Sequence, residues 1–107
     1  MEPHEKERLR LKADVFKAMG HPIRLGIIEM LAHQEKCVCE IVEYVGTDIS
    51  NVSKHLSVLK RHGLVADRKE GLKVYYRLTM PCAVEFAGCV GSVVLNRLEE
   101  QRAVMVG

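Results

Sequence analysis

The sequence predicts a mainly α-helical domain with a single β-hairpin, and three observations support this fold class. Apolar residues recur every three or four positions along most of the 107 residues, which is typical of amphipathic helices. After Gly63 the period changes to two, which indicates a pair of strands. Hydrophobic residues make up 48% of the chain and charged residues 28%, so residues 1–107 are expected to fold as one globular domain.

Two helices are expected in the first third of the chain. The first runs from Glu5 to Met19 and carries a rough apolar stripe among Lys and Arg residues. Gly20-His21 interrupts this pattern, and Pro22 then suits the first turn of a second helix, where its missing N–H is not needed. The second helix is expected to reach about His33, and its high apolar content predicts that it is buried in the core.

A polar connection at residues 34–36 leads to two more helices that are separated by a tight turn. The first is expected from Val38 to Val45, and Gly46-Thr47 forms the turn. The second covers Asp48 to Arg61. Its apolar residues recur at i, i+4 and i+7, so they form one stripe that faces a core: Val52, Leu56 and Leu59. This is the layout of a helix-turn-helix.

The ends and the polar face of the helix from Asp48 to Arg61 carry further information. Asp48 or Ser50 can cap its N-terminus by accepting a hydrogen bond from a backbone N–H. Gly63 can adopt the positive φ that ends a helix. The polar face presents hydroxyl, amide, imidazole and ammonium groups without a carboxylate, and such groups bind base edges and phosphates. An ordinary amphipathic surface helix is the alternative interpretation.

A hairpin and a last helix complete the chain. Residues 64–69 and 72–78 read as strands, and Glu70-Gly71 forms the turn between them. The whole is therefore a winged helix-turn-helix with about five helices and a two-stranded wing. The last helix is expected from Thr79 to about Arg102, and its apolar residues cover more than one face. This surplus predicts a homodimer through the terminal helices, and packing against the first helix is the alternative.

Charge is distributed unevenly, although the formal net charge is only +2. Residues 48–77 contain seven Lys or Arg and three Asp or Glu, whereas residues 27–47 contain one Lys and four Glu. A basic zone beside an acidic one is expected of a protein that places one surface on DNA. Aromatic residues, at 5%, are too scarce for single-strand binding by stacking. The expected contacts to double-stranded DNA come from Ser50, Asn51, Ser53, Lys54, His55, Lys60, Arg61, Arg68, Lys69 and Lys73.

The sequence also bears on location and redox state. No apolar run approaches the ~18 residues that a membrane span requires, and the charged N-terminus does not read as a signal peptide. A cytoplasmic protein without a membrane partner is therefore expected. In that compartment the four Cys residues are expected to be thiols rather than structural disulfides.

The chain resembles the ArsR/SmtB family of small winged-helix repressors over about residues 10–100. The segments that carry the resemblance are FKAMGHPIRLGIIEMLA (16–32), KCVCEI (36–41), ISNVSKHLSVLKRHGLV (49–65) and RKEGLKVYYRL (68–78). The resemblance implies a homodimer that sits on an imperfect inverted repeat and blocks transcription until an effector lowers its affinity for DNA. It is closest to the arsenical-resistance repressors, which carry a Cys-Val-Cys before the recognition helix, here Cys37-Val38-Cys39.

The Cys37/Cys39 pair can act chemically only if its two sulfurs converge. In a regular helix, side chains at i and i+2 diverge by about 200°, so convergence requires the irregular backbone of a helix start. There the helix N-terminus and Lys36 would favour thiolates, which bind soft, thiophilic ions. We therefore expect arsenite or antimonite as the effector, with Cys37 and Cys39 as ligands.

The sequence leaves open which residue, beyond Cys37 and Cys39, supplies a further ligand to the bound ion. Many arsenical repressors have a third Cys three residues after the second, where this chain has Val42. Cys82 and Cys89 are further candidates, with three alternative roles. In the first, one of them completes the Cys37/Cys39 site; in the second, each pairs with a thiol of the other subunit; in the third, both are packing residues in the dimer interface. Some relatives bind zinc through Asp, His and Glu on the last helix, and residues 80–100 lack His.

Functions other than repression controlled by arsenite or antimonite are also compatible with these residues. A redox or reactive-sulfur thiol switch and a zinc- or cadmium-type sensor of the same fold are the alternatives. An enzyme is not expected, because no Cys–His–carboxylate set occurs at suitable places and so small a domain leaves little room for a substrate cleft.

Overall fold

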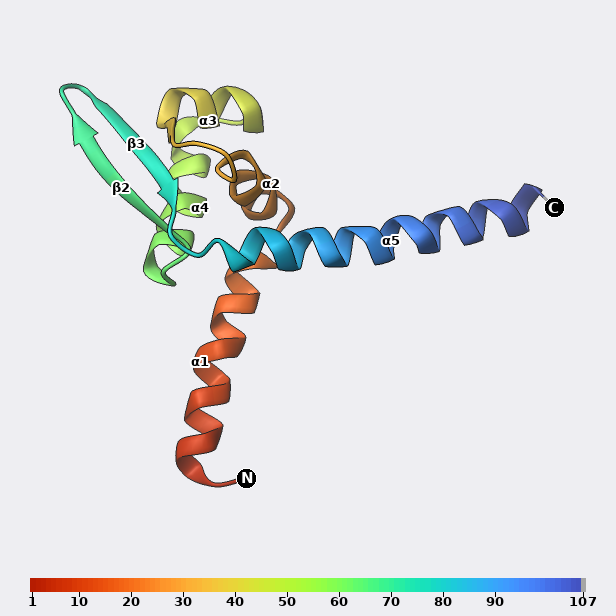
Figure 1. Ribbon diagram of the computed structural model, residues 1–107. Coiled ribbons are helices and arrows are strands. Elements are labelled where there is room, and N and C mark those ends of the chain that lie inside the picture. The colour runs from red at the N-terminus through yellow and green to blue at the C-terminus, as the bar shows by residue number, and fades with distance from the viewer. Residues whose placement is uncertain (107) are drawn as a thin grey trace.

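The computed structural model describes residues 1–106 of the chain as helices joined to a small antiparallel sheet (Figure 1). The elements, in order, are α1 (Pro3–Met19), α2 (Pro22–Met30), β1 (Lys36–Cys37), α3 (Val38–Val45), α4 (Ile49–Arg61), β2 (Val65–Glu70), β3 (Lys73–Leu78) and α5 (Cys82–Val106). The winged helix-turn-helix is thereby confirmed.

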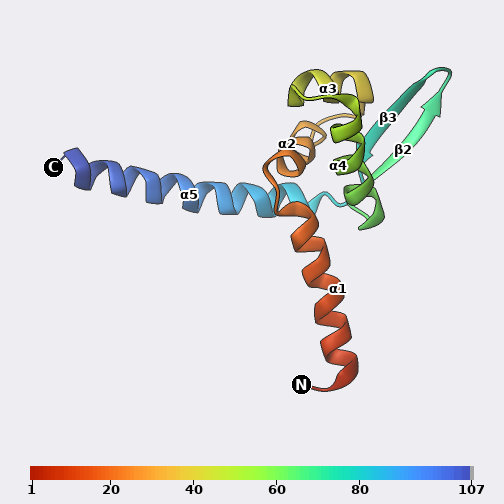
Figure 2. The same cartoon turned by 180° about the vertical axis from the view of Figure 1, so that it is seen from behind.

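Two helices project from a compact head. Figures 1 and 2 show α2, α3, α4 and the sheet packed together, while most of α1 and α5 extends away from them in different directions. The radius of gyration is 16.8 Å, compared with about 13 Å for a compact domain of this size. Large apolar side chains stay exposed along the projecting helices, among them Phe16 on α1 and Val94 on α5. Within residues 1–106 no helix combines the length and apolar character that a membrane span needs.

The core lies where the three central helices meet. The stripe predicted on α4 is buried, with Val52 and Leu59 fully inaccessible and Leu56 1% exposed. Ile27 and Ile28 of α2, like Ile41 of α3, are also fully buried. Each such side chain contributes roughly 1.5–3 kcal/mol of transfer free energy, so this cluster holds α4 firmly against α2 and α3.

Local signals set the ends of the two helix-turn-helix elements. Gly46 ends α3 with φ of 78°, a left-handed conformation that glycine adopts without strain. Asp48 caps α4, and its side chain accepts a hydrogen bond from the backbone N–H of Asn51 at 2.8 Å. Gly63 follows α4 with φ of 75°. The expected N-cap and C-terminal glycine of α4 are thus confirmed.

The sheet differs from the expected two-stranded wing in having a third strand. The order is β1-β3-β2, all antiparallel, with Lys36 opposite Tyr76 and Cys37 opposite Tyr75. Part of the predicted polar connection is therefore a strand, because the extended backbone before α3 gains hydrogen-bond partners along the free edge of β3. Similarly, α2 ends at Met30, earlier than predicted.

Candidate nucleic-acid interface and cysteine pair

The exposed face of α4 presents short polar side chains next to a lysine. Ser50, Ser53 and Lys54 are exposed in the first two turns, and Asn51 is partly buried. The Asn51 side-chain amide donates to the Thr47 hydroxyl at 3.5 Å. Because the buried stripe of the same helix is held in the core, these groups stand on a rigid element. That arrangement suits hydrogen bonding to base edges and phosphates.

Several predicted DNA contacts are instead engaged within the chain. The Lys60 ammonium lies 2.9 Å from an Asp67 carboxylate oxygen, and this pairing lowers the pKa of Asp67 and raises that of Lys60. Arg68 pairs with Glu35 and, at 2.8 Å, with Glu70. Lys60 and Arg68 must therefore exchange carboxylate partners for phosphates if they contact DNA.

The guanidinium of Arg68 is held on a third side as well. Its carbon lies 4.6 Å from the centre of the Tyr75 ring, within the range of a cation–π interaction. Hydrogen bonding to Arg68 lowers the pKa of Glu35, which precedes β1. Arg68 thus ties β2 to the segment before β1 and braces the middle of the wing.

Other cations are unpaired within residues 1–106. Lys54 and Arg61 of α4 and Lys69 and Lys73 of the wing take part in no ion pair there. All four side chains are exposed. They form the part of the predicted basic surface that can meet a polyanion without first losing a carboxylate partner.

His55 occupies a different setting from its neighbours on α4. It is half-buried, and its Nδ1 lies 3.2 Å from Nη1 of Arg24 on α2. Its ring lies against that of His21, with centroids 4.4 Å apart. Burial, reinforced by the charges of His21 and Arg24, lowers the pKa of His55. The structure therefore places this predicted DNA contact in an intramolecular network.

Cys37 and Cys39 are joined by a disulfide bond, and the expectation of four free thiols is wrong for this pair. The predicted irregularity is present, because Cys37 is the N-cap of α3 with an extended backbone at φ −76° and ψ 158°. The two side chains consequently converge although their residues are only two apart. The sequence contains no direct signal of oxidation state, so a prediction for this pair depends on the expected compartment alone.

The sulfur of Cys37 also caps a helix. It accepts a hydrogen bond from the backbone N–H of Glu40 at 3.4 Å, and Glu40 Oε1 accepts from the Cys37 N–H at 3.1 Å. This is a capping box with sulfur in place of the usual hydroxyl. Cys37 is 4% exposed, whereas Cys39 is exposed.

A groove connects the disulfide to the candidate DNA-binding residues. It has a volume of about 490 Å³ and lies between the start of α3, the start of α4 and the wing. Cys37 and Cys39 line it together with Ser53 of α4 and Lys73 of β3. A change at either sulfur thus occurs within the same groove as two residues expected to contact DNA.

The other two cysteines lie apart on α5 and are exposed thiols. In residues 1–106 no group of three or more His, Cys, Asp or Glu side chains is placed to hold a metal ion. One chain therefore offers two sulfurs at Cys37 and Cys39, without a third ligand. Pairing of Cys82 or Cys89 with the other subunit stays a prediction.

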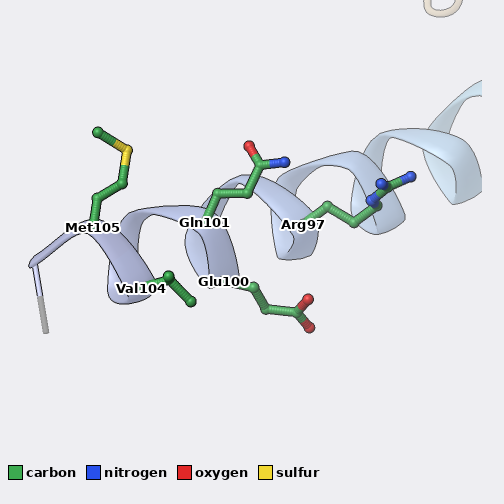
Figure 3. A pocket seen from close by; sticks show the side chains of 5 residues that line it. All are labelled: Arg97, Glu100, Gln101, Val104 and Met105. Atoms are coloured by element: carbon green, nitrogen blue, oxygen red, sulfur yellow. The ribbon is translucent and has the colours of Figure 1, made fainter.

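A shallow hollow also lies near the end of α5 (Figure 3). Its lining residues, Arg97 to Met105, all belong to this one helix, and no second element faces them. A surface formed by a single projecting helix cannot enclose a ligand, so we assign it no binding role.

The residues that sequence reasoning missed act through tertiary contacts. Arg24, Glu35 and Tyr75 each hold a predicted site residue in place. Arg24 and His55 are 31 positions apart, and Glu35 and Arg68 are 33 apart. No local pattern links residues at such separations, although Arg24 is one of only two charged residues in the apolar helix α2.

Comparison with known proteins places the chain among bacterial regulators. Residues 21–67 match the model of the family described as "Bacterial regulatory protein, arsR family". An uncharacterized HTH-type transcriptional regulator of Mycobacterium tuberculosis is 35% identical over 97 residues, covering 90% of this chain and 85% of that protein. The arsenical resistance operon repressor of Escherichia coli is 37% identical over 70 residues, covering 64% and 60% of the two chains.

Solved structures show the same architecture. A homodimeric winged helix-turn-helix DNA-binding domain from Mycobacterium bovis superposes with a TM-score of 0.79 at 31% identity, covering 94% of this chain and 93% of that one. The crystal structure of the M. tuberculosis regulator superposes with a TM-score of 0.73 at 36% identity, covering 96% and 99%.

Proposed function

This chain belongs to the arsR family of bacterial regulatory proteins, and we propose that it is a DNA-binding transcriptional repressor controlled through Cys37 and Cys39. The observation that carries the proposal is the groove that these two cysteines share with Ser53 and Lys73. A ligand bound to the sulfurs lies against both the helix and the wing that are proposed to contact DNA. Regulators, rather than enzymes, are what the family match supports.

In the proposed complex, α4 is the recognition helix and enters the major groove. Ser50, Asn51, Ser53 and Lys54 face the bases and the nearest phosphates, and Arg61 reaches the backbone. Lys69 and Lys73 place the wing on the adjacent backbone or minor groove. Each cation that replaces a counterion steepens the salt dependence of binding. His55, Lys60 and Arg68 contribute less to DNA binding, because intramolecular partners already hold them.

The proposed repressor acts as a homodimer. The ring of Phe16 on α1 packs edge to face against that of Phe86 on α5, with the ring centroids 5.5 Å apart. Exposed apolar side chains continue along both helices beyond this contact. A second copy would cover that surface and would place two recognition helices about 34 Å apart, in successive major grooves. The operator is therefore expected to be an imperfect inverted repeat of double-stranded DNA.

The proposed effector is arsenite or antimonite, bound by the two thiolates of the reduced Cys37/Cys39 pair. Both sulfurs are soft ligands once reduced, and the disulfide between them means that the two side chains can turn toward one point. Closing a ring through a metalloid would change the start of α3, where Cys37 caps the helix. A zinc- or cadmium-type site is less favoured, since residues 1–106 offer no group of three ligands.

A second candidate is a redox or reactive-sulfur thiol switch. The specific observation in its favour is the Cys37–Cys39 disulfide, which has no free thiolate to offer an ion. In this version oxidation itself, rather than metalloid binding, alters the groove and changes the affinity for DNA. Reduction restores the original state.

Titration of the protein–DNA complex distinguishes the two candidates. Binding to its own promoter fragment is followed by fluorescence anisotropy while arsenite, zinc, cadmium or a disulfide-forming oxidant is added to reduced protein. Cys37→Ser/Cys39→Ser is the test variant, and Cys82→Ser/Cys89→Ser is the matched control. Release by arsenite that only the test variant loses supports the metalloid repressor. Release by oxidant alone supports the switch, and no binding to any promoter fragment rejects a repressor.

A further inference from the structure

We propose that Arg24 is a positioning residue that sets the recognition helix α4 against the end of α1, with the His55 ring as its acceptor. The inference rests on the proposed function, because it concerns how DNA-binding helices are spaced. It assigns His55 to this bridge instead of to the operator. Three elements are joined at one guanidinium: α1, α2 and α4.

The geometry of the bridge is defined by three hydrogen bonds. Arg24 Nε donates to the carbonyl oxygen of Ala18 at 2.5 Å, and Nη2 donates to that of Lys17 at 3.3 Å. Nη1 donates to Nδ1 of His55 at 3.2 Å. The planar guanidinium thus uses separate nitrogens for α1 and for α4. A lysine ammonium cannot reproduce this arrangement, because its donors radiate from one atom.

The α1 end of the bridge satisfies groups that a helix leaves unpaired. The last carbonyls of a helix lack intrahelical donors and carry the negative end of its dipole. Lys17 and Ala18 lie in the last turn of α1, and the Gly20 N–H donates to the Lys17 carbonyl at 3.1 Å. Arg24 supplies further donors and a positive charge at this point. The bond therefore holds the direction in which α1 leaves the head.

The α4 end of the bridge requires a neutral imidazole. A guanidinium only donates, so Nδ1 of His55 must accept and its proton must sit on Nε2. His21, whose ring packs on His55, is similarly constrained, because its Nδ1 accepts from the Ile23 N–H at 3.1 Å as the N-cap of α2. Arg24 and His21 are the charged and titratable groups that act on His55. A proton on His55 removes the acceptor and adds repulsion with Arg24.

The consequence concerns the distance between two recognition helices. The α1 helix carries Phe16, which packs on Phe86 of α5 within the proposed dimer surface. In a dimer, the distance between the two α4 helices therefore depends on the angle between α1 and α4 within each chain. A residue that fixes this angle selects among operators whose half-sites differ in spacing. Arg24 should thus affect spacing preference more than overall affinity.

A panel of synthetic inverted repeats with half-site spacing varied one base pair at a time tests the proposal. We expect Arg24→Ala to reduce the ratio between the preferred and the next-best spacing by about fivefold or more. His55→Ala removes only the α4 end and should act in the same direction. His55→Asn is the matched control, because its side-chain oxygen takes the place of Nδ1 without titrating. Circular dichroism confirms that each variant is folded.

A pH series supplies a readout that a purely structural role would not change. Because the pKa of His55 is lowered, spacing preference of the wild type should weaken only as the pH falls below about 6.5, while His55→Asn should keep its preference throughout. Equal weakening on every spacing in both alanine variants would overturn the proposal. So would a pH series that is the same in wild type and His55→Asn. If the wild type binds none of the repeats, the proposed function itself fails, which is a different result.

Discussion

The double role of Cys37, as a helix cap and as half of a disulfide, can be separated by mutation. Cys37→Ala removes the acceptor for the Glu40 N–H together with the disulfide. Cys37→Ser removes the disulfide but offers a hydroxyl oxygen as acceptor. Cys39→Ser also removes the disulfide and leaves the cap intact. Comparing the three variants therefore isolates the cap.

The magnitudes follow from the capping geometry and from the sequence separation of two. An N-cap acceptor contributes typically about 1 kcal/mol. The loop-closure relation for a ring of about three residues gives roughly 1.6 kcal/mol for the disulfide. Relative to the oxidised wild type, Cys39→Ser and Cys37→Ser should thus lose about 1.6 kcal/mol of unfolding free energy. Cys37→Ala should lose about 2.6 kcal/mol when both contributions are removed.

Thermal unfolding followed by circular dichroism, at one fixed protein concentration, is the assay. In a domain of this size about 1 kcal/mol corresponds to roughly 4–8 °C in Tm, so Cys37→Ala should melt that far below Cys37→Ser. A reductant should lower the Tm of the wild type and leave all three variants unchanged. If Cys37→Ala and Cys37→Ser melt together, the sulfur does not act as the cap and the reasoning is refuted.

Three further predictions concern α4. Lys54→Ala should weaken operator binding and reduce the slope of log K against log salt by about 1, and an unchanged slope would exclude a phosphate contact. Leu59→Ala should lower the unfolding free energy, measured by denaturant titration, by about 2–5 kcal/mol because Leu59 is fully buried. Ser57→Ala, at an exposed position, is the control, and an equal loss in both variants would contradict the burial of Leu59 in the core. The lowered pKa of His55 means that the unfolded chain takes up the proton first, so stability should fall below about pH 6.5, and His55→Asn should remove this loss.

The elements that could be predicted are those with short-range causes. The bounds of α4 follow from a 3.6-residue period, from Asp48 three residues before the N–H that it caps, and from Gly63 after the last turn. The strands of the wing follow from alternation on either side of a glycine turn. Each of these signals lies within a few residues of the element that it defines, so the bounds of these elements depend little on tertiary contacts.

The elements that could not be predicted depend on distant partners. Strand β1 exists because β3 offers it a free edge, and two residues of sequence carry no such information. His55 belongs to the polar face of α4 by periodicity, yet Arg24 and His21 enclose it. For Cys37 and Cys39 the convergence was predictable from the helix start, whereas the covalent bond depends on redox conditions that no residue encodes.

The ion pairs of Lys60 and Arg68 affect how many cations of the basic surface should contribute to the salt dependence of DNA binding. A cation already paired with Asp67 or Glu35 must give up that carboxylate to neutralise a phosphate. The freed carboxylate then takes up a cation from solution, which offsets the counterion that the phosphate releases. The number of ions released on operator binding should therefore follow Lys54, Arg61, Lys69 and Lys73, rather than every Lys and Arg near the surface. The same carboxylates repel phosphates wherever the fit is poor, so misaligned DNA is penalised without any base being read.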